Sequence, residues 1–187
     1  MPDRPIRALL DRTSGGPTPG RPGVVVADQG VGKTALLVHV ALHALWEGRK
    51  VLHVSLTDAV ERIRGWYDEL SRGQRLSGEA LGQERRRMIL SYAERPFDPV
   101  HLSSQLHMLK EVAQFDADVL LLDGVDADRW LEHGEALSRL SGDLGMPAWV
   151  AVSSPQGVVR SIGTAAFVVR LAQEDGVMRL RLVVDDR

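Results

Sequence analysis

Short apolar runs alternate along the chain with longer segments in which apolar residues recur at helical spacing. The apolar runs are bounded by turn-prone or polar residues and predict strands at 24–27, 50–56, 88–92, 118–124 and 148–154. The periodic segments predict helices at 33–46, 58–70, 98–115 and 127–144. The C-terminal part predicts two further strands joined by a hairpin turn at 174–176.

This alternation predicts an α/β fold with a mostly parallel central sheet, helices on both faces and a C-terminal β-hairpin at one edge. With 187 residues, we expect a single domain over 1–187. Residues 1–22 are expected to form a Gly/Pro-rich leading segment, and residues 71–87 a polar, mobile loop. Ligands of such sheets bind beyond the carboxyl ends of the strands. Four segments would meet there: 27–34, 57–58, 123–124 and 153–156.

The segment between the first predicted strand and the first predicted helix reads ADQGVGKT (27–34). It fits the pattern of a phosphate-binding P-loop, with alanine in the first glycine position. Gly30 and Gly32 would let the backbone curl so that its N–H groups face phosphate oxygens. Lys33 would reach the β- and γ-phosphates, and the Thr34 hydroxyl would bind Mg²⁺. The expected nucleotide site comprises Ala27, Asp28, Gln29, Gly30, Val31, Gly32, Lys33, Thr34 and Ala35.

A P-loop also requires a carboxylate near the magnesium ion, at the end of a neighbouring apolar strand. Asp123 stands at this place in VLLLDG (119–124) and is the predicted Walker B acid. We therefore expect the chain to bind ATP and Mg²⁺, with Thr34 and Asp123 at the metal and Lys33 and Asp123 as catalytic candidates.

Other P-loop classes fit the sequence less well. A GTPase would carry Asn-Lys-x-Asp after a late strand and Asp-x-x-Gly after the Walker B strand, but the chain has SSPQG and DGVD at these places. A small-molecule kinase would carry an arginine-bearing lid between the middle strands. The arginines between positions 72 and 87 could form such a lid, so a kinase stays an alternative.

Composition narrows the partners and the compartment. Hydrophobic residues make up 44% of the chain, which is typical of a globular protein, and the formal net charge is −2, which gives DNA binding no electrostatic support. The absence of cysteine excludes disulfides and Cys-ligated zinc. The N-terminal residues show no signal-peptide core, and no apolar run reaches the ~20 residues that a membrane span needs. We expect no DNA binding, no membrane insertion and a cytoplasmic location.

Over most of its length the sequence resembles the RecA-like ATPases, in particular the branch of KaiC, RadA and the DnaB helicases. The similarity is carried by LDRTSGGPTPG (10–20), GRKVLHVSLTDAVERI (48–63), FDADVLLLDG (115–124) and RLRLVVDDR (179–187). It implies an ATP-binding core that assembles into hexameric rings or filaments, with active sites between subunits.

The sequence also departs from that family at charged positions. The family's water-orienting glutamate falls on Thr57, and the following Asp58 could act either as a shorter base or as the N-cap of the next helix. The family's trans-acting lysine falls on Asp185, which leaves Arg187 as the contact to a neighbour's γ-phosphate. Gln156 could sense the γ-phosphate or be a plain loop residue. These departures imply slow or absent hydrolysis.

We therefore expect a MgATP-binding domain with slow hydrolysis that acts as an oligomerising or partner-regulating nucleotide switch. The alternative is a non-hydrolysing ATP-binding module that regulates a partner. Residues 62–87 are rich in arginine, and residues 116–135 are rich in acids. These segments are either solvated faces or complementary surfaces, and the second case predicts a weak homo-oligomer or a protein partner.

Overall fold

The computed structural model describes residues 4–72, 84–93, 97–155, 163–175 and 177–183. Its elements are, in chain order, α1 (Arg4–Arg12), β1 (Gly23–Ala27), α2 (Lys33–Trp46), β2 (Val51–Ser55), α3 (Val60–Arg72), β3 (Arg87–Ser91), α5 (Pro99–Glu111), β4 (Val119–Asp126), α6 (Ala127–Asp143), β5 (Ala148–Ser153), β6 (Phe167–Glu174) and β7 (Val177–Val183). In the described residues, seven strands form one sheet in the order β3-β2-β4-β5-β1-β6-β7. Only the β6–β7 pair is antiparallel, so the predicted α/β fold with a C-terminal hairpin is confirmed.

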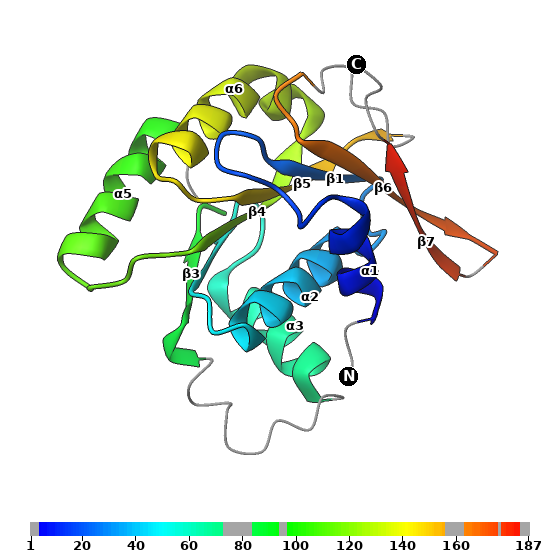
Figure 1. Ribbon diagram of the computed structural model, residues 1–187, viewed down its shortest axis with the longest axis horizontal. Helices are drawn as coiled ribbons and strands as arrows, with labels where there is room; N and C mark the ends of the chain where they lie inside the picture. Colours follow the sequence, from blue (N-terminus) through cyan, green and yellow to red (C-terminus); the bar gives the residue numbers. More distant parts are fainter. Residues whose placement is uncertain (1–3, 73–83, 94–96, 156–162, 176, 184–187) are drawn as a thin grey trace.

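Helices cover both faces of the sheet (Figure 1). On one face α1, α2 and α3 pack on strand residues such as Val25 and Leu121. On the other face α5 and α6 pack on their sequence neighbours, for example Val24 and Leu122. Successive strand residues point to opposite faces, so the central strands are buried on both sides. This double burial explains why their sequences are apolar runs rather than alternating patterns.

Helix α1 is the described element that the sequence did not predict. Residues 1–22 were expected to be a Gly/Pro-rich segment, but Arg4–Arg12 is helical and the first glycines follow it. Ile6 and Leu9 lie three residues apart on one face of this helix and are buried in the same core cluster as α2. Gly15, at φ 96°, follows the helix, and its N–H donates to the Leu10 carbonyl.

The predicted loop 71–87 is described only at its ends. Its first two residues complete α3, and Arg87 begins β3. Residues 73–83 lie outside the described part of the chain.

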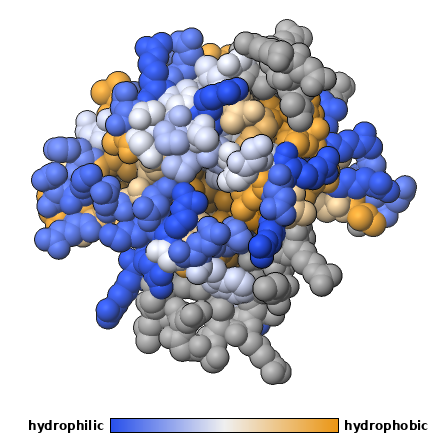
Figure 2. Space-filling model, viewed as in Figure 1, coloured by the Kyte–Doolittle hydropathy of each residue, from blue (hydrophilic) through white to orange (hydrophobic). Residues whose placement is uncertain are grey.

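None of the helices in the described residues is long and apolar enough to cross a membrane. In the space-filling view, apolar side chains show between hydrophilic ones beside the β6–β7 hairpin (Figure 2). The outer strand of that hairpin exposes Val177, Met178 and Val183.

Candidate functional site

The predicted P-loop connects β1 to α2 at the carboxyl end of the sheet. β1 ends at Ala27, and α2 begins at Lys33, as the sequence predicted. Gly30 and Gly32 have φ of 80° and 91°, a region that L side chains rarely adopt, so the loop requires glycine at both places. The space above Gly30 is open, since a Cβ added there would meet no atom within 4 Å. The loop is therefore a curled backbone with room for an anion at a helix N-terminus.

Lys33 lies inside this loop rather than in solvent. Only 7% of the residue is exposed, and its Nζ donates to the carbonyls of Ala27 at 3.1 Å and Asp28 at 2.6 Å. Burial lowers the pKa of Lys33, whereas the charges of Asp123 and Asp28 oppose that shift. The ammonium group thus sits where the loop curls, close to the predicted Walker B acid.

Asp123 and Thr34 meet as predicted. Asp123 is 4% exposed, and the Thr34 side chain lies close enough to lower its pKa through a hydrogen bond. Burial raises the pKa of Asp123, and the nearby charge of Asp58 raises it further. The hydrogen bonds from Thr34 and Gly124 and the charge of Lys33 act in the opposite direction. A buried carboxylate, a hydroxyl and an ammonium group therefore converge at one point.

Asp123 and Gly124 form a β-bulge where the sequence had placed the end of the strand. The β4–β5 register shifts between Leu122 and Val125, and β4 continues to Asp126. Gly124 has φ of 84°, and a Cβ there would lie 2.6 Å from the Thr57 hydroxyl oxygen. Bulges commonly re-aim a side chain beside an active site. Asp123 thus supplies the carboxylate, and Gly124 adopts the positive φ that the bulge requires.

The residues fit a magnesium–nucleotide complex better than a free metal ion. No group of three or more His, Cys, Asp or Glu side chains that could hold a metal occurs in the part of the chain that the structure describes. Mg²⁺ at nucleotide sites is usually bound through one or two carboxylates together with substrate phosphates. Thr34 and Asp123 supply such a partial set beside the open loop.

Asp58 was predicted as either a base or the N-cap of α3. Helix α3 begins at Val60, so Asp58 lies two residues before the helix, one position ahead of the N-cap. The Asp58 N–H donates to Ser55 Oγ, and its carboxylate lies 3.3 Å from Arg62 Nε. Its position near Asp123 leaves the role of a base untested.

Three further positions from the sequence analysis cannot be placed. Gln156, Asp185 and Arg187 lie outside the described residues. Thr57 is described and exposed, with its side chain against Gly124.

Sequence reasoning missed two features of the site. His53 in β2 is fully buried between Tyr67 and Asp123, with Nδ1 3.0 Å from the Tyr67 hydroxyl. The histidine within an otherwise apolar run is the signal in the sequence that could have indicated this feature.

The second feature is Met178 in β7, whose methyl carbon would lie 3.3 Å from a Cβ on Gly32. Since β6 pairs with β1 only as far as Arg170, the hairpin extends beyond β1 and flanks the loop.

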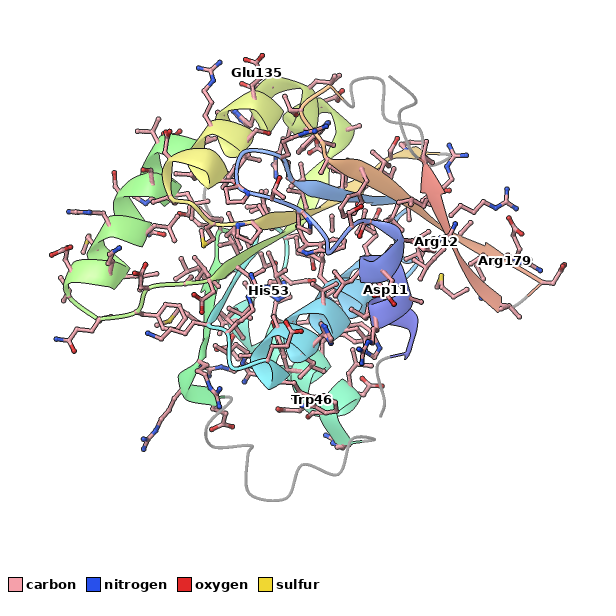
Figure 3. All side chains as sticks on the ribbon, viewed as in Figure 1. Asp11, Arg12, Trp46, His53, Glu135 and Arg179 are labelled. Atoms are coloured by element: carbon pink, nitrogen blue, oxygen red, sulfur yellow. The ribbon has the colours of Figure 1, made fainter. Side chains whose placement is uncertain are left out.

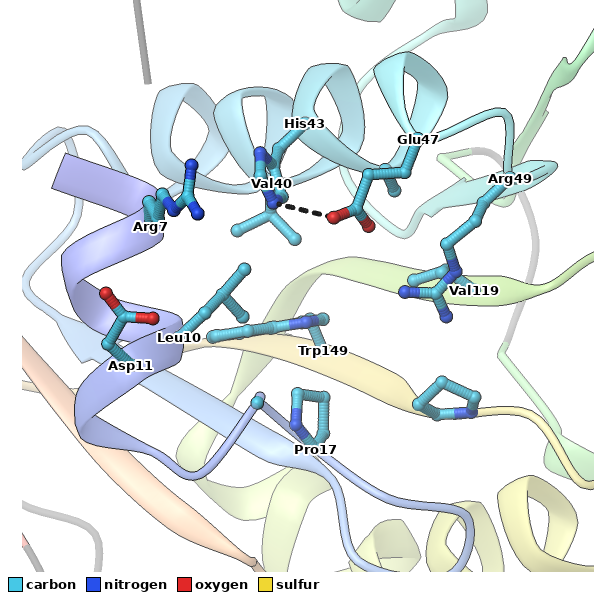
Figure 4. A pocket seen from close by; sticks show the side chains of 13 residues that line it. Arg7, Leu10, Asp11, Pro17, Val40, His43, Glu47, Arg49, Val119 and Trp149 are labelled. Atoms are coloured by element: carbon cyan, nitrogen blue, oxygen red, sulfur yellow. Dashed lines mark ion pairs between the residues drawn. The ribbon is translucent and has the colours of Figure 1, made fainter. Parts of the chain in front are cut away.

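A large cavity lies away from this site. It encloses about 590 Å³ between α1, the C-terminal half of α2 and the starts of β4 and β5 (Figure 4). Trp149 and Leu10 line it, and its charged residues include Arg7, Asp11 and Glu47; Glu47 pairs with His43 at 3.4 Å. These residues lie at the opposite end of the strands from the P-loop. The volume of a cavity alone therefore does not identify the candidate site.

No model of a known protein family matches the chain, and comparison with curated proteins gives no match either.

Proposed function

We propose that the chain binds MgATP in the loop 27–34 and acts as a slow, RecA-like ATPase domain that works as a nucleotide switch. The observation that supports it most directly is the pair of buried groups Lys33 and Asp123, with the Lys33 ammonium hydrogen-bonded inside the loop. Burying a lysine and an aspartate is costly unless they are paired or used, so such groups cluster at functional sites.

Each residue has a role in this proposal. The loop N–H groups and the start of α2 bind the phosphates, and Lys33 exchanges its two loop carbonyls for the β- and γ-phosphates. Thr34 would bind Mg²⁺ directly, and Asp123 would orient the ion's shell. The bound Mg²⁺ supplies charge neutralisation of the phosphates.

Slow turnover follows from the residues next to the site. Thr57 carries no carboxylate, and the Asp58 carboxylate is already in contact with Arg62. A carboxylate held by a guanidinium is poorly placed to take a proton from water. The protein with ATP bound, rather than rapid hydrolysis of ATP, would then regulate the partner. A module without any hydrolysis is the alternative.

Calorimetric titration of the full chain with ATP, with and without Mg²⁺, tests the proposal. We expect one site whose affinity rises with Mg²⁺, and bound nucleotide should raise the midpoint of thermal unfolding. Absence of both heat and thermal shift would overturn it. Steady-state phosphate release then separates the slow ATPase from the module without hydrolysis.

We also propose that this switch acts through weak association with a second copy or a protein partner. Asp128 and Glu132 are exposed at the start of α6, and Arg85 is exposed ahead of β3. Exposed ion pairs contribute under about 1 kcal/mol each and are screened over about 8 Å at physiological salt. Sedimentation velocity should therefore show association that ATP strengthens and salt weakens. A monomer under every condition would reject self-association.

A further inference from the structure

A chain of buried polar groups leads away from Asp123, the carboxylate of the candidate magnesium site. His53 in β2 is 0% exposed and lies between Asp123 in β4 and Tyr67 in α3. The rings of His53 and Tyr67 meet edge to face, and the Arg87 guanidinium lies 4.3 Å from the centre of the Tyr67 ring. Figure 3 shows His53 in the interior of the molecule. Four elements therefore contribute to a connected polar path behind the P-loop.

One atom in this path lacks a partner. Among the buried side-chain nitrogen and oxygen atoms of the described residues, His53 Nε2 is without a hydrogen bond. It lies 4.0 Å from Asp123 Oδ2, which is too far for a hydrogen bond. An unsatisfied buried donor is unfavourable, and native structures retain few of them. The atom is therefore well placed to donate to or accept from a group that moves within reach.

The groups on the two sides of the ring define that interaction. The Tyr67 hydroxyl lies 3.0 Å from Nδ1, and the Asp123 carboxylate lies on the side of Nε2. Burial raises the pKa of Tyr67, so its phenol stays protonated and can donate to His53 Nδ1. We assign the ring proton to Nε2, since Nδ1 then accepts from Tyr67 and Nε2 presents a donor to the carboxylate.

We propose that His53 is a positioning residue for Asp123, and that its Nε2–H donates to the carboxylate once MgATP fills the site. The inference rests on the proposed function and adds a residue to it. A hydrogen bond from the Thr34 side chain lowers the pKa of Asp123. Coordination of Mg²⁺ through the Thr34 hydroxyl oxygen would leave that O–H free to donate, and the carboxylate has lone pairs for a further donor such as His53 Nε2–H. A shift of about 1 Å toward His53 would bring Nε2 within hydrogen-bond distance.

This role differs from that of a packing histidine. A phenylalanine could fill the same volume and preserve the contact with Tyr67, but it could not donate to Asp123. A glutamine offers an N–H donor and would restore the interaction in part. Partners that orient metal ligands typically change metal affinity by about 10–100-fold when they are replaced.

The test compares ATP affinity with and without Mg²⁺ in the full chain, by calorimetry. For His53→Phe we expect the gain in affinity from Mg²⁺ to fall by about tenfold or more, while affinity for ATP in EDTA stays within about twofold. His53→Gln should recover part of the gain, and Tyr67→Phe should show a smaller loss. His107→Gln, which changes an exposed histidine on α5, is the matched control. A wild-type Mg²⁺ gain in folded His53→Phe would overturn the proposal.

A second readout does not depend on the variants folding. Long-range ¹H–¹⁵N correlation spectra of the labelled wild type should show a neutral His53 with the proton on Nε2, and that proton should move downfield when MgATP is added. A proton on Nδ1, or an Nε2 proton unchanged on saturation, would overturn the role of His53. Failure of the wild type to bind ATP at all would instead overturn the proposed function, so the two failures are distinguishable.

Discussion

The charged side chains at the two ends of the parallel strands differ in how deeply they are buried. At the carboxyl end, Lys33 and Asp123 are almost completely buried and their pKa values are shifted by that burial. At the amino end, the roomy cavity beside Trp149 is bordered by Arg7 and Glu47, whose side chains are exposed. Exposed charges cost little, whereas buried charges reduce stability and are kept where chemistry needs them. The candidate site is thus marked by buried charge rather than by the cavity.

The largest expected effect is on ligand binding by the carboxyl end. Lys33→Ala should lower ATP affinity by ~100-fold or more, because charge-assisted hydrogen bonds contribute about 1.5–3 kcal/mol each and at least two would be lost. Arg49→Ala, at the amino-end cavity, should leave affinity unchanged, as should the exposed Lys110→Ala. Calorimetry of the three variants checks this. Equal losses of ATP affinity in Lys33→Ala and Arg49→Ala would contradict nucleotide binding at the carboxyl end alone.

The next effect concerns the bulge that aims Asp123. Gly124→Ala should destabilise the protein by about 2–4 kcal/mol, because it combines a left-handed backbone with overlap against the Thr57 side chain. Gly145→Ala is the matched control, since Gly145 also has positive φ but a Cβ there would meet no atom within 4 Å. Denaturant unfolding gives both free energies. Adding Thr57→Ala should recover part of the loss, and similar values for both glycine variants would refute the overlap.

A smaller and opposite effect is expected at Asp123 itself. Burial raises its pKa in the folded state, so the ionised carboxylate reduces stability at neutral pH; the penalty disappears as pH falls through the folded pKa and the carboxyl is protonated. Asp123→Asn should therefore raise the free energy of unfolding at pH 7 by on the order of 1 kcal/mol. The difference should shrink as pH falls through the folded pKa, and the two proteins should converge below the pKa of the unfolded chain, where the carboxyl is protonated in both states.

Unfolding curves of the wild type and Asp123→Asn, measured across pH, test this difference in free energy of unfolding. Titration of both proteins with MgATP measures the effect of the substitution on binding. The Asn variant should lose most of the Mg²⁺-dependent gain in affinity. A less stable Asn variant at neutral pH would mean that the Asp123 carboxylate is structural.

The smallest effect on stability is expected at Asp58. Its contact with Arg62 is an i,i+4 pair in which the arginine side chain is 72% exposed, so Asp58→Asn should change stability by less than about 0.5 kcal/mol. MgATP affinity should stay the same, and residual phosphate release should fall if the carboxylate orients water. Unchanged turnover would rule out that role.

The sequence predicted the fold well where periodicity and burial agree. The apolar runs became strands, of which the central ones are buried on both faces and the edge strand β3 is partly buried. Helix α2 has the predicted bounds because Gly32 and the change to apolar helical spacing define its start. Helix α1 was missed because its short amphipathic pattern precedes a segment dominated by glycine and proline. Asp58, predicted as either a base or a cap, lies two residues before α3, with its backbone N–H on Ser55 and its carboxylate beside Arg62.

The candidate site was predicted as far as its motifs reach. Lys33, Thr34 and Asp123 could be found because P-loop chemistry requires those residue types at defined places. His53 could not, since its partner Tyr67 comes from a different element and only the folded packing brings the two rings together. Likewise, the approach of Met178 to Gly32 depends on how far the hairpin extends beyond β1.

Amide shift mapping with MgATP tests the central claim most directly, because it reports on both ends of the sheet at once. ¹H–¹⁵N spectra of the full chain, titrated to saturation, should show the largest perturbations at Gly30, Gly32, Lys33 and Thr34. The amide of Trp149 in the amino-end cavity should move little. Perturbations centred on Trp149, or none above those in buffer with Mg²⁺ alone, would contradict nucleotide binding at the loop.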